Sequence, residues 1–97
     1  MEIIETPLKD CFIIKSKKFG DDRGFFLEAL NQKHLKNAGI DLNVQQINFA
    51  KSGKNVLRGL HYQLEPMAQA KYVGVISGAA VDVAVDIRES SPTFGQY

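Results

Sequence analysis

Aliphatic side chains alternate with small or polar ones along residues 81–88 of this chain, which read VDVAVDIR. A period of two residues is typical of a β-strand with one buried face and one more polar face. Residues 44–50, 56–63 and 72–76 are also expected to be strands, and turn-forming residues separate them. This spacing is that of an antiparallel sandwich or barrel, so the sequence predicts a mostly β fold.

The first part of the chain predicts a hairpin followed by one short helix. Residues 13–19 and 25–30 are apolar or mixed runs, and the sequence GDDRG at 20–24 between them favours a tight turn. Asn31 is a good N-cap, and Gly39 is a suitable C-terminal stop. We therefore expect a helix over residues 32–38.

Length and composition limit the function classes. A chain of 97 residues is one domain, residues 1–97, with 44% hydrophobic and 24% charged residues, as in ordinary globular proteins. Its formal net charge of +1 comes from scattered cations, which argues against nucleic-acid binding but leaves small anionic ligands open. The single cysteine, Cys11, lies among apolar residues and is expected to be a buried, inert thiol.

Targeting signals are not visible in the sequence. No apolar run approaches the roughly 20 residues of a membrane span, and Met1-Glu2 is not the basic start of a signal peptide. We therefore expect a cytoplasmic protein with no membrane partner.

The stretch VLRGLHYQ at residues 56–63 carries the most chemistry, because a guanidinium and an imidazole lie close together in it. An arginine offers a planar fork to phosphate or carboxylate. Histidine, with an ordinary pKa of about 6.5, is suited to take protons near neutrality. On a regular strand Arg58 and His61 would point to opposite faces, and a bulge at Gly59 would bring them together. From the residues alone, two surface side chains on a strand remain the alternative.

Several blocks of this sequence are similar to signatures of one enzyme family, in the same order. They are DRGFFLE at 22–28, QIN at 46–48, the stretch at 56–63, QAK at 69–71, DVAVDIR at 82–88 and SPTFGQ at 91–96. The chain thereby resembles the amino-terminal half of the dTDP-4-dehydrorhamnose 3,5-epimerases, which are sugar-nucleotide epimerases of the cupin type. The resemblance implies an antiparallel jelly roll, partial at this length, with one short helix.

The resemblance also implies a reaction and its residues. His61 matches the base that removes protons at C3 and C5 of a 4-keto sugar, dTDP-4-dehydro-6-deoxyglucose, in dTDP-rhamnose biosynthesis. Lys71 matches a cation that stabilises the resulting enolate. The positions that match substrate contacts are Arg23, Glu28, Gln46, Asn48 and Arg58. Gln46 and Asn48 share strand parity, so one face can present both.

The sequence departs from the family pattern in three respects. Phe49 and Ala50 stand where small polar residues are usual, and Gly74 replaces a common basic residue. The general acid and the aspartate that orients the base match nothing here, although Asp82 or Asp86 is a possible substitute partner for His61. A base without that acid is expected to give enolisation or proton exchange more readily than inversion.

Partners and rival functions follow from the same features. We expect a homodimer in which strands of each subunit complete the other's sheet, because an unpaired sheet edge is normally covered. No cofactor and no metal are expected, since His34 and His61 are too few for a metal cupin and His34 belongs to the expected helix. A 3-only epimerase is the nearest variant, and a non-catalytic module that binds sugar nucleotides or serves in assembly is the alternative class.

Overall fold

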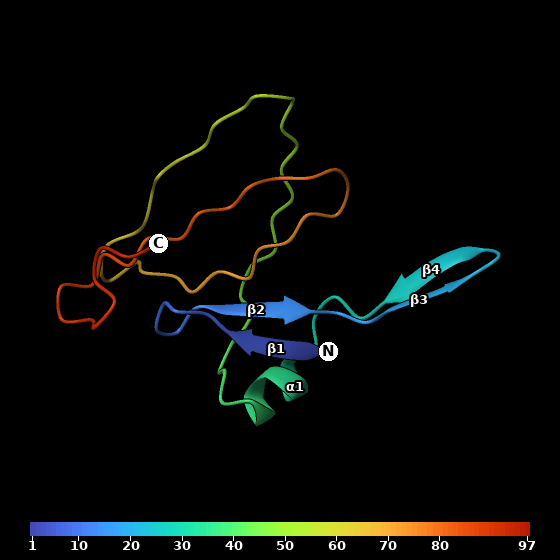
Figure 1. The fold of residues 1–97 in the computed structure, drawn as a ribbon, viewed down its shortest axis with the longest axis horizontal. Helices are drawn as coiled ribbons and strands as arrows, with labels where there is room; N and C mark the ends of the chain where they lie inside the picture. Colours follow the sequence, from blue (N-terminus) through green and yellow to red (C-terminus); the bar gives the residue numbers. More distant parts are fainter.

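The regular elements of the protein are mostly β. In the computed structural model, which describes residues 1–97, they are β1 (Glu2–Glu5), β2 (Phe12–Lys15), β3 (Lys18–Asp21), β4 (Gly24–Leu27) and α1 (Gln32–Asn37) (Figure 1). The strands form two separate antiparallel pairs, β1 with β2 and β3 with β4. The mostly β class with one short helix is thus confirmed, but these paired strands do not form a jelly roll.

The first hairpin joins β1 to β2, with Ile3 opposite Ile14 and Ile4 opposite Ile13. Its turn is held by the hydroxyl of Thr6, which accepts a hydrogen bond from the amide of Leu8 at 3.2 Å and donates one to the carbonyl of Cys11 at 2.8 Å. β1 was not expected from the sequence. The single strand expected at 13–19 is instead divided between β2 and β3, which belong to different sheets.

The second hairpin, β3–β4, confirms the turn expected at residues 20–24. The Asp21 carboxylate accepts a hydrogen bond from the amide of Arg23 at 2.9 Å, and Gly24 has a φ of +132°, which favours glycine. Phe19 and Phe26 are paired across the strands and are 54% and 70% exposed. The hairpin projects from the rest of the chain (Figure 1), so its aromatic side chains lack a covering layer.

The helix begins and ends at the predicted signals. The side chain of Asn31 accepts a hydrogen bond from the amide of His34 at 3.0 Å, as an N-cap should. At the other end, the amides of Gly39 and Ile40 bond to the carbonyls of Lys36 and Leu35, and Gly39 has a φ of +80°. This is a Schellman motif, which needs the left-handed conformation that glycine adopts readily. With 6 residues, α1 falls far short of what a bilayer crossing requires.

Residues 40–97 contain no strand, so the prediction of strands at 44–50, 56–63, 72–76 and 81–87 is wrong for this structure. Their apolar side chains are largely exposed, as at Val81, which is 94% exposed. A strand exists only when its backbone groups bond to a neighbouring strand, and the only sheets are β1–β2 and β3–β4. Asp86 makes backbone bonds with Gly95 and Gln96, but these do not extend into a ladder. Alternation in the sequence indicates which side chains would lie on each face of a strand. It does not show that a neighbouring strand is present to form backbone hydrogen bonds.

Burial is confined to a few positions. Only Leu8, Leu35 and Asp86 are buried, and the accessible surface is 9147 Å². A compact monomer of this mass exposes about 5,500 Å². The radius of gyration, 15.5 Å, likewise exceeds the roughly 13 Å of a compact chain of this length. The chain therefore presents a large apolar surface that a compact protein would cover.

Candidate functional site

Residues 56–63, which carry Arg58 and His61, form no strand, and Gly59 within them has a φ of +98°. The bulge expected at Gly59 is therefore absent, because a bulge needs a paired strand. Arg58 donates hydrogen bonds from Nε to the hydroxyl of Ser52 at 2.9 Å and from Nη2 to the carbonyl of Lys51 at 3.4 Å. The guanidinium is thus tied to the preceding loop, and no hydrogen bond joins it to His61.

His61 lies against the backbone of Gly59. A β-carbon placed on Gly59 would come within 3.2 Å of Nδ1 of His61 and within 3.8 Å of its Cε1 atom. The histidine is exposed and makes no hydrogen bond with another side chain. Its ring nitrogens are therefore open to a ligand.

Gln46 and Asn48 meet on one side of the chain, as their spacing predicts. Nε2 of Gln46 donates a hydrogen bond to Oδ1 of Asn48 at 2.9 Å. Both residues are exposed. The pair leaves the carbonyl oxygen of Gln46 and the amide nitrogen of Asn48 for a ligand, which is one acceptor and one donor.

Arg23 and Glu28 lie at opposite ends of β4. The guanidinium of Arg23 donates from Nε to the carboxylate of Asp21 at 3.1 Å, and this contact lowers the pKa of Asp21 and raises that of Arg23. Glu28 accepts a hydrogen bond from Nδ2 of Asn31 at 3.0 Å, and its other oxygen lies 3.6 Å from Nδ1 of His34. His34 is an exposed helical residue, as expected.

Lys71 is exposed, and its neighbour Tyr72 anchors this part of the chain. The phenol of Tyr72 donates a hydrogen bond to the carbonyl of Ala29 at 2.5 Å, and burial raises its pKa above the ordinary 10.0. The tether holds the segment after Lys71 beside the end of β4. No hydrogen bond or ion pair links Lys71 to His61.

The expected site residues therefore form local groups and are not gathered into one pocket. A hollow of about 310 Å³ at the β3–β4 hairpin includes Arg23 with Phe19, Phe25 and Phe26. A second hollow, of about 270 Å³, lies between the turn of the first hairpin and residues 84–88. It is lined by Asp86, which the sequence offered as a partner for His61, but by none of the expected catalytic or substrate-binding residues. Cys11 lines this second hollow and is half-buried, so the expected full burial of its thiol is wrong.

Asp86 is the centre of the densest polar cluster, and the sequence analysis did not predict this cluster. Its side chain is 2% exposed and accepts from Nε and Nη2 of Arg88 at 2.9 and 3.0 Å. The hydroxyls of Ser91 and Thr93 donate to Oδ2 at 2.5 and 2.6 Å. Arg88 first, and then these two hydroxyls, hold the pKa of the Asp86 carboxyl far below its usual range. We call these residues, Asp86, Arg88, Ser91 and Thr93, the Asp86 clamp.

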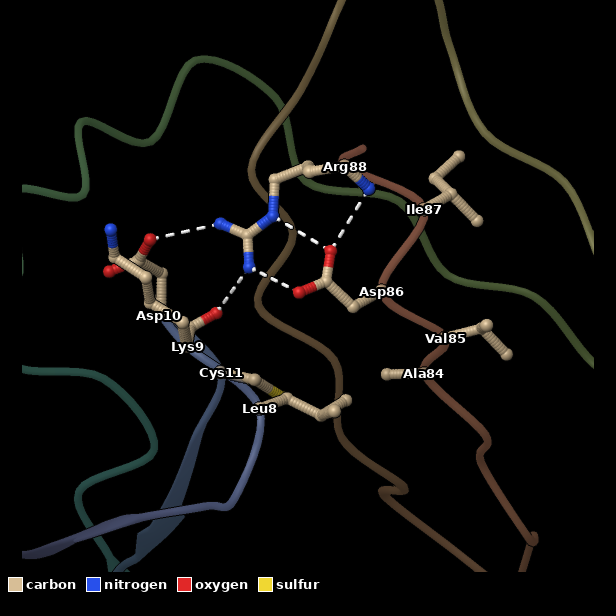
Figure 2. A pocket seen from close by; sticks show the side chains of 9 residues that line it. All are labelled: Leu8, Lys9, Asp10, Cys11, Ala84, Val85, Asp86, Ile87 and Arg88. Carbon is tan, nitrogen blue, oxygen red and sulfur yellow. Dashed lines mark hydrogen bonds and ion pairs between the residues drawn. The ribbon is translucent and has the colours of Figure 1, made fainter. Parts of the chain in front are cut away.

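The Asp86 clamp ties the chain to its first hairpin. Arg88 donates from Nη1 to the carboxylate of Asp10 at 3.0 Å and from Nη2 to the carbonyl of Lys9 at 2.7 Å. Figure 2 shows the guanidinium of Arg88 lying between Asp86 and the turn that carries Lys9 and Asp10. These contacts bridge residues separated by 78 and 79 positions in sequence.

The clamp corrects one expectation about His61. Both carboxylate oxygens of Asp86 are occupied by Arg88, Ser91 and Thr93, so Asp86 is not a partner for the imidazole. The detectable signal was the spacing of Asp86 and Arg88, because residues two apart on an extended chain share a face. Opposite charges at that spacing are close enough to form an ion pair, as Asp86 and Arg88 do.

Comparison with known proteins assigns this sequence to a family. The family model described as dTDP-4-dehydrorhamnose 3,5-epimerase matches residues 5–97. The chain belongs to the dTDP-4-dehydrorhamnose 3,5-epimerase family. The matched range contains residues 46, 48, 59 and 61 and those of the Asp86 clamp, and it begins before the blocks that carry the resemblance in the sequence. No solved structure matches this epimerase-family chain.

Individual relatives agree with the family match. Proteins named dTDP-4-dehydrorhamnose 3,5-epimerase from Shigella flexneri and Salmonella typhimurium are 54% and 49% identical over 100% of this chain. One from Methanothermobacter thermautotrophicus is 40% identical over 97% of it. The aligned part is 54%, 54% and 50% of these three relatives, so the epimerase-family chain spans about half their length.

Proposed function

We propose that this protein acts in the conversion of dTDP-4-dehydro-6-deoxyglucose to dTDP-4-dehydrorhamnose, by epimerisation at C3 and C5. The observation that supports this most is the family match over residues 5–97, which spans every residue expected to take part. The 4-keto group makes the protons at C3 and C5 acidic, because the carbanion is delocalised as an enolate. The protein's task is to supply a base and to stabilise the enolate oxygen.

His61 is proposed as the base and Lys71 as the cation that stabilises the enolate. His61 is exposed and without a side-chain hydrogen bond, which suits a group that must approach a substrate carbon. Lys71 is also exposed and forms no ion pair with a carboxylate of this chain. The Tyr72 tether restricts where Lys71 can lie.

The proposed substrate contacts are chemically suited to a nucleotide diphosphate sugar. Arg58 keeps Nη1 free while Ser52 and Lys51 hold its other nitrogens, so the guanidinium is oriented before an anion binds. Arg23 offers a second cation beside exposed aromatic rings that suit a base or sugar face. Glu28, Gln46 and Asn48 supply acceptors and donors for hydroxyl groups or base edges.

The direct test is exchange of substrate protons with solvent. Incubated with dTDP-4-dehydro-6-deoxyglucose in D₂O, the chain is expected to incorporate deuterium at both C3 and C5, measured by NMR of the recovered sugar. Incorporation at C3 alone would indicate a 3-only epimerase. Binding without incorporation at either carbon would favour the alternative, a non-catalytic module that binds the sugar nucleotide or serves in assembly.

We also propose that the chain functions as a homodimer. Support comes from the exposed aromatic residues of the β3–β4 hairpin, where Phe25 is 62% and Phe26 is 70% exposed, and from the apolar surface of residues 40–97. Monomeric proteins rarely leave such contiguous apolar patches uncovered.

The charged, pyrophosphate-bearing substrate does not cross membranes unaided, which supports a cytoplasmic location.

Sedimentation equilibrium tests the dimer. The native chain is expected to sediment with twice the monomer mass of 10.8 kDa at micromolar concentration. Phe26→Asp places a carboxylate among the hairpin aromatics and is expected to shift this mass toward the monomer, whereas Gln32→Asp on α1 adds the same single negative charge and leaves the mass unaffected. A native chain that stays monomeric up to high concentration would refute the dimer.

A further inference from the structure

One hydrogen bond ties the long irregular segment of the chain to the elements before it. The phenol of Tyr72 donates to the carbonyl of Ala29 at 2.5 Å, across 43 positions of sequence. The other hydrogen bonds of residues 43–85 join residues within that segment. Tyr72 therefore contributes the polar contact that sets where this segment lies relative to β4.

This bond also connects the neighbours of two proposed site residues. Ala29 follows Glu28, and Tyr72 follows Lys71. The acceptor is itself anchored, because Ala29 lies between the end of β4 and Asn31, the N-cap of α1. The side chain of Asn31 donates a further hydrogen bond to Glu28 at 3.0 Å. The tether thus brings the main chain at Lys71 to the segment that carries Glu28.

The phenol of Tyr72 is suited to a lasting bond. Tyr72 is 39% exposed, against 64% for Tyr62 and 89% for Tyr97, so it is the most covered of the three tyrosines. Burial raises the pKa of Tyr72 above 10.0, and the hydroxyl therefore keeps the proton that it donates throughout the neutral range. A partly covered hydrogen bond is also stronger than one between groups surrounded by water.

We propose that Tyr72 is a positioning residue, which brings Lys71 and Glu28 into one site by bonding to the carbonyl of Ala29. This inference rests on the proposed function for its effect on catalysis, in which Lys71 stabilises the enolate and Glu28 contacts the substrate. Without the bond, the main chain at Lys71 is no longer held beside Glu28. A displacement of about 1 Å in a catalytic site can cost roughly 10²-fold in rate.

Tyr72→Phe tests the proposal, because it removes the hydroxyl and keeps the ring. Deuterium incorporation into dTDP-4-dehydro-6-deoxyglucose is expected to fall roughly tenfold to 10²-fold. The dissociation constant for this sugar nucleotide is expected to stay within a fewfold of native, because enolate stabilisation acts on the transition state. Tyr97→Phe is the matched control, since it removes an exposed hydroxyl, and it is expected to retain the native rate.

Repeating the substitution in a Lys71→Ala background distinguishes positioning from general support of the structure. If Tyr72 acts through Lys71, Tyr72→Phe costs no further rate once the ammonium is gone. An equal fold-loss in both backgrounds overturns the inference, and so does a native rate in Tyr72→Phe. A native rate in Lys71→Ala removes the proposed cation and overturns it as well.

A spectroscopic measurement separates the tether from the proposed function. The carbonyl ¹³C signal of Ala29 is expected to move upfield in Tyr72→Phe, where the hydrogen bond is lost, and to stay in place in Tyr97→Phe. The amide signal of Lys71 is expected to move with it. Unmoved Ala29 and Lys71 signals in a folded Tyr72→Phe chain overturn the inference.

The native chain decides if Tyr72→Phe does not fold. The geometry requires a nuclear Overhauser effect between the ring protons beside the hydroxyl of Tyr72 and the protons of Ala29, and its absence overturns the inference. A native chain that incorporates no deuterium, but whose Lys71 amide signal responds to Tyr72→Phe, refutes the proposed function. The tether and its placement of Lys71 then remain supported.

Discussion

His61→Ala is expected to lower deuterium incorporation at C3 and C5 by roughly 10² to 10⁴, the range that a positioned general base contributes. The substitution removes the proposed proton acceptor while Arg58 keeps its bonds to the preceding loop. Binding of the sugar nucleotide should therefore change little. Loss of rate with retained affinity is the signature of a group that acts in the transition state. The rate is measured by NMR of the sugar, and the affinity by calorimetry.

His34→Ala is the matched control, because it removes the chain's other histidine. His34 is exposed on α1 and lies 3.6 Å from an oxygen of Glu28, a surface pair of the kind that contributes little. Its removal should leave incorporation within about twofold of native. If His61→Ala incorporates deuterium at the native rate, another group is the base and the proposed mechanism fails.

Short-range features of the fold were predictable, because their causes lie in adjacent residues. The Asn31 cap and the Gly39 stop set the ends of α1, and the GDDRG sequence set the β3–β4 turn. The spacing of Gln46 and Asn48 placed both on one face, and the two side chains do lie together, although without the expected strand. Each depends on hydrogen bonds or dihedral preferences within a few positions of the chain.

Long-range features were not predictable in the same way. The apolar alternation over residues 81–88 implies a strand, yet a ladder needs a second chain segment at the right distance, and Val81 lies in the open instead. The same pattern assigned Asp86 to a polar outer face, whereas its side chain is 2% exposed. A carboxylate is buried when enough donors surround it, and the alternation does not reveal donors from residues 91 and 93.

The candidate site likewise has some features that the sequence predicts and others that it does not. The proposed chemistry rests on the residue types at positions 58, 61 and 71. Gly59 does have a positive φ, but the bulge expected there is absent because residues 56–63 form no strand. The orientation of the imidazole depends on the conformation of residues 59–61, which the residue types alone do not reveal. Only coordinates show that Nδ1 of His61 lies over Gly59.

The Asp86 clamp is the part of this chain whose loss should loosen the structure most. In Asp86→Asn one carboxylate oxygen becomes an amide nitrogen that cannot accept from Arg88, Ser91 or Thr93, and Arg88 keeps only Asp10 as a charge partner. The backbone bonds that close this loop, from the amide of Gly95 to the carbonyl of Asp86 at 2.7 Å and from the amide of Asp86 to Gln96, should open. Their hydrogen-exchange protection factors are expected to fall roughly tenfold or more.

Acid provides an independent test of the same group. The pKa of the Asp86 carboxyl is lower in the folded chain than its ordinary 3.8, so the folded state favours the ionised form. The clamp's contribution to stability is therefore complete well above pH 3.8, declines as the pH falls below that value, and is lost once the pH has fallen through the lower, folded-state value. Protection at Gly95 should be the same at pH 7 and at about pH 5, and should decline only in stronger acid.

Asp82→Asn is the control for both measurements, since Asp82 is exposed in the same segment and makes no hydrogen bond through its side chain. It should leave protection at Gly95 unchanged. Arg88 also bonds to Lys9 and Asp10, so the effect of Asp86→Asn should extend to the amides of the first hairpin's turn. Native protection at Gly95 in Asp86→Asn would mean that the backbone bonds alone close the loop and that the buried carboxylate is dispensable.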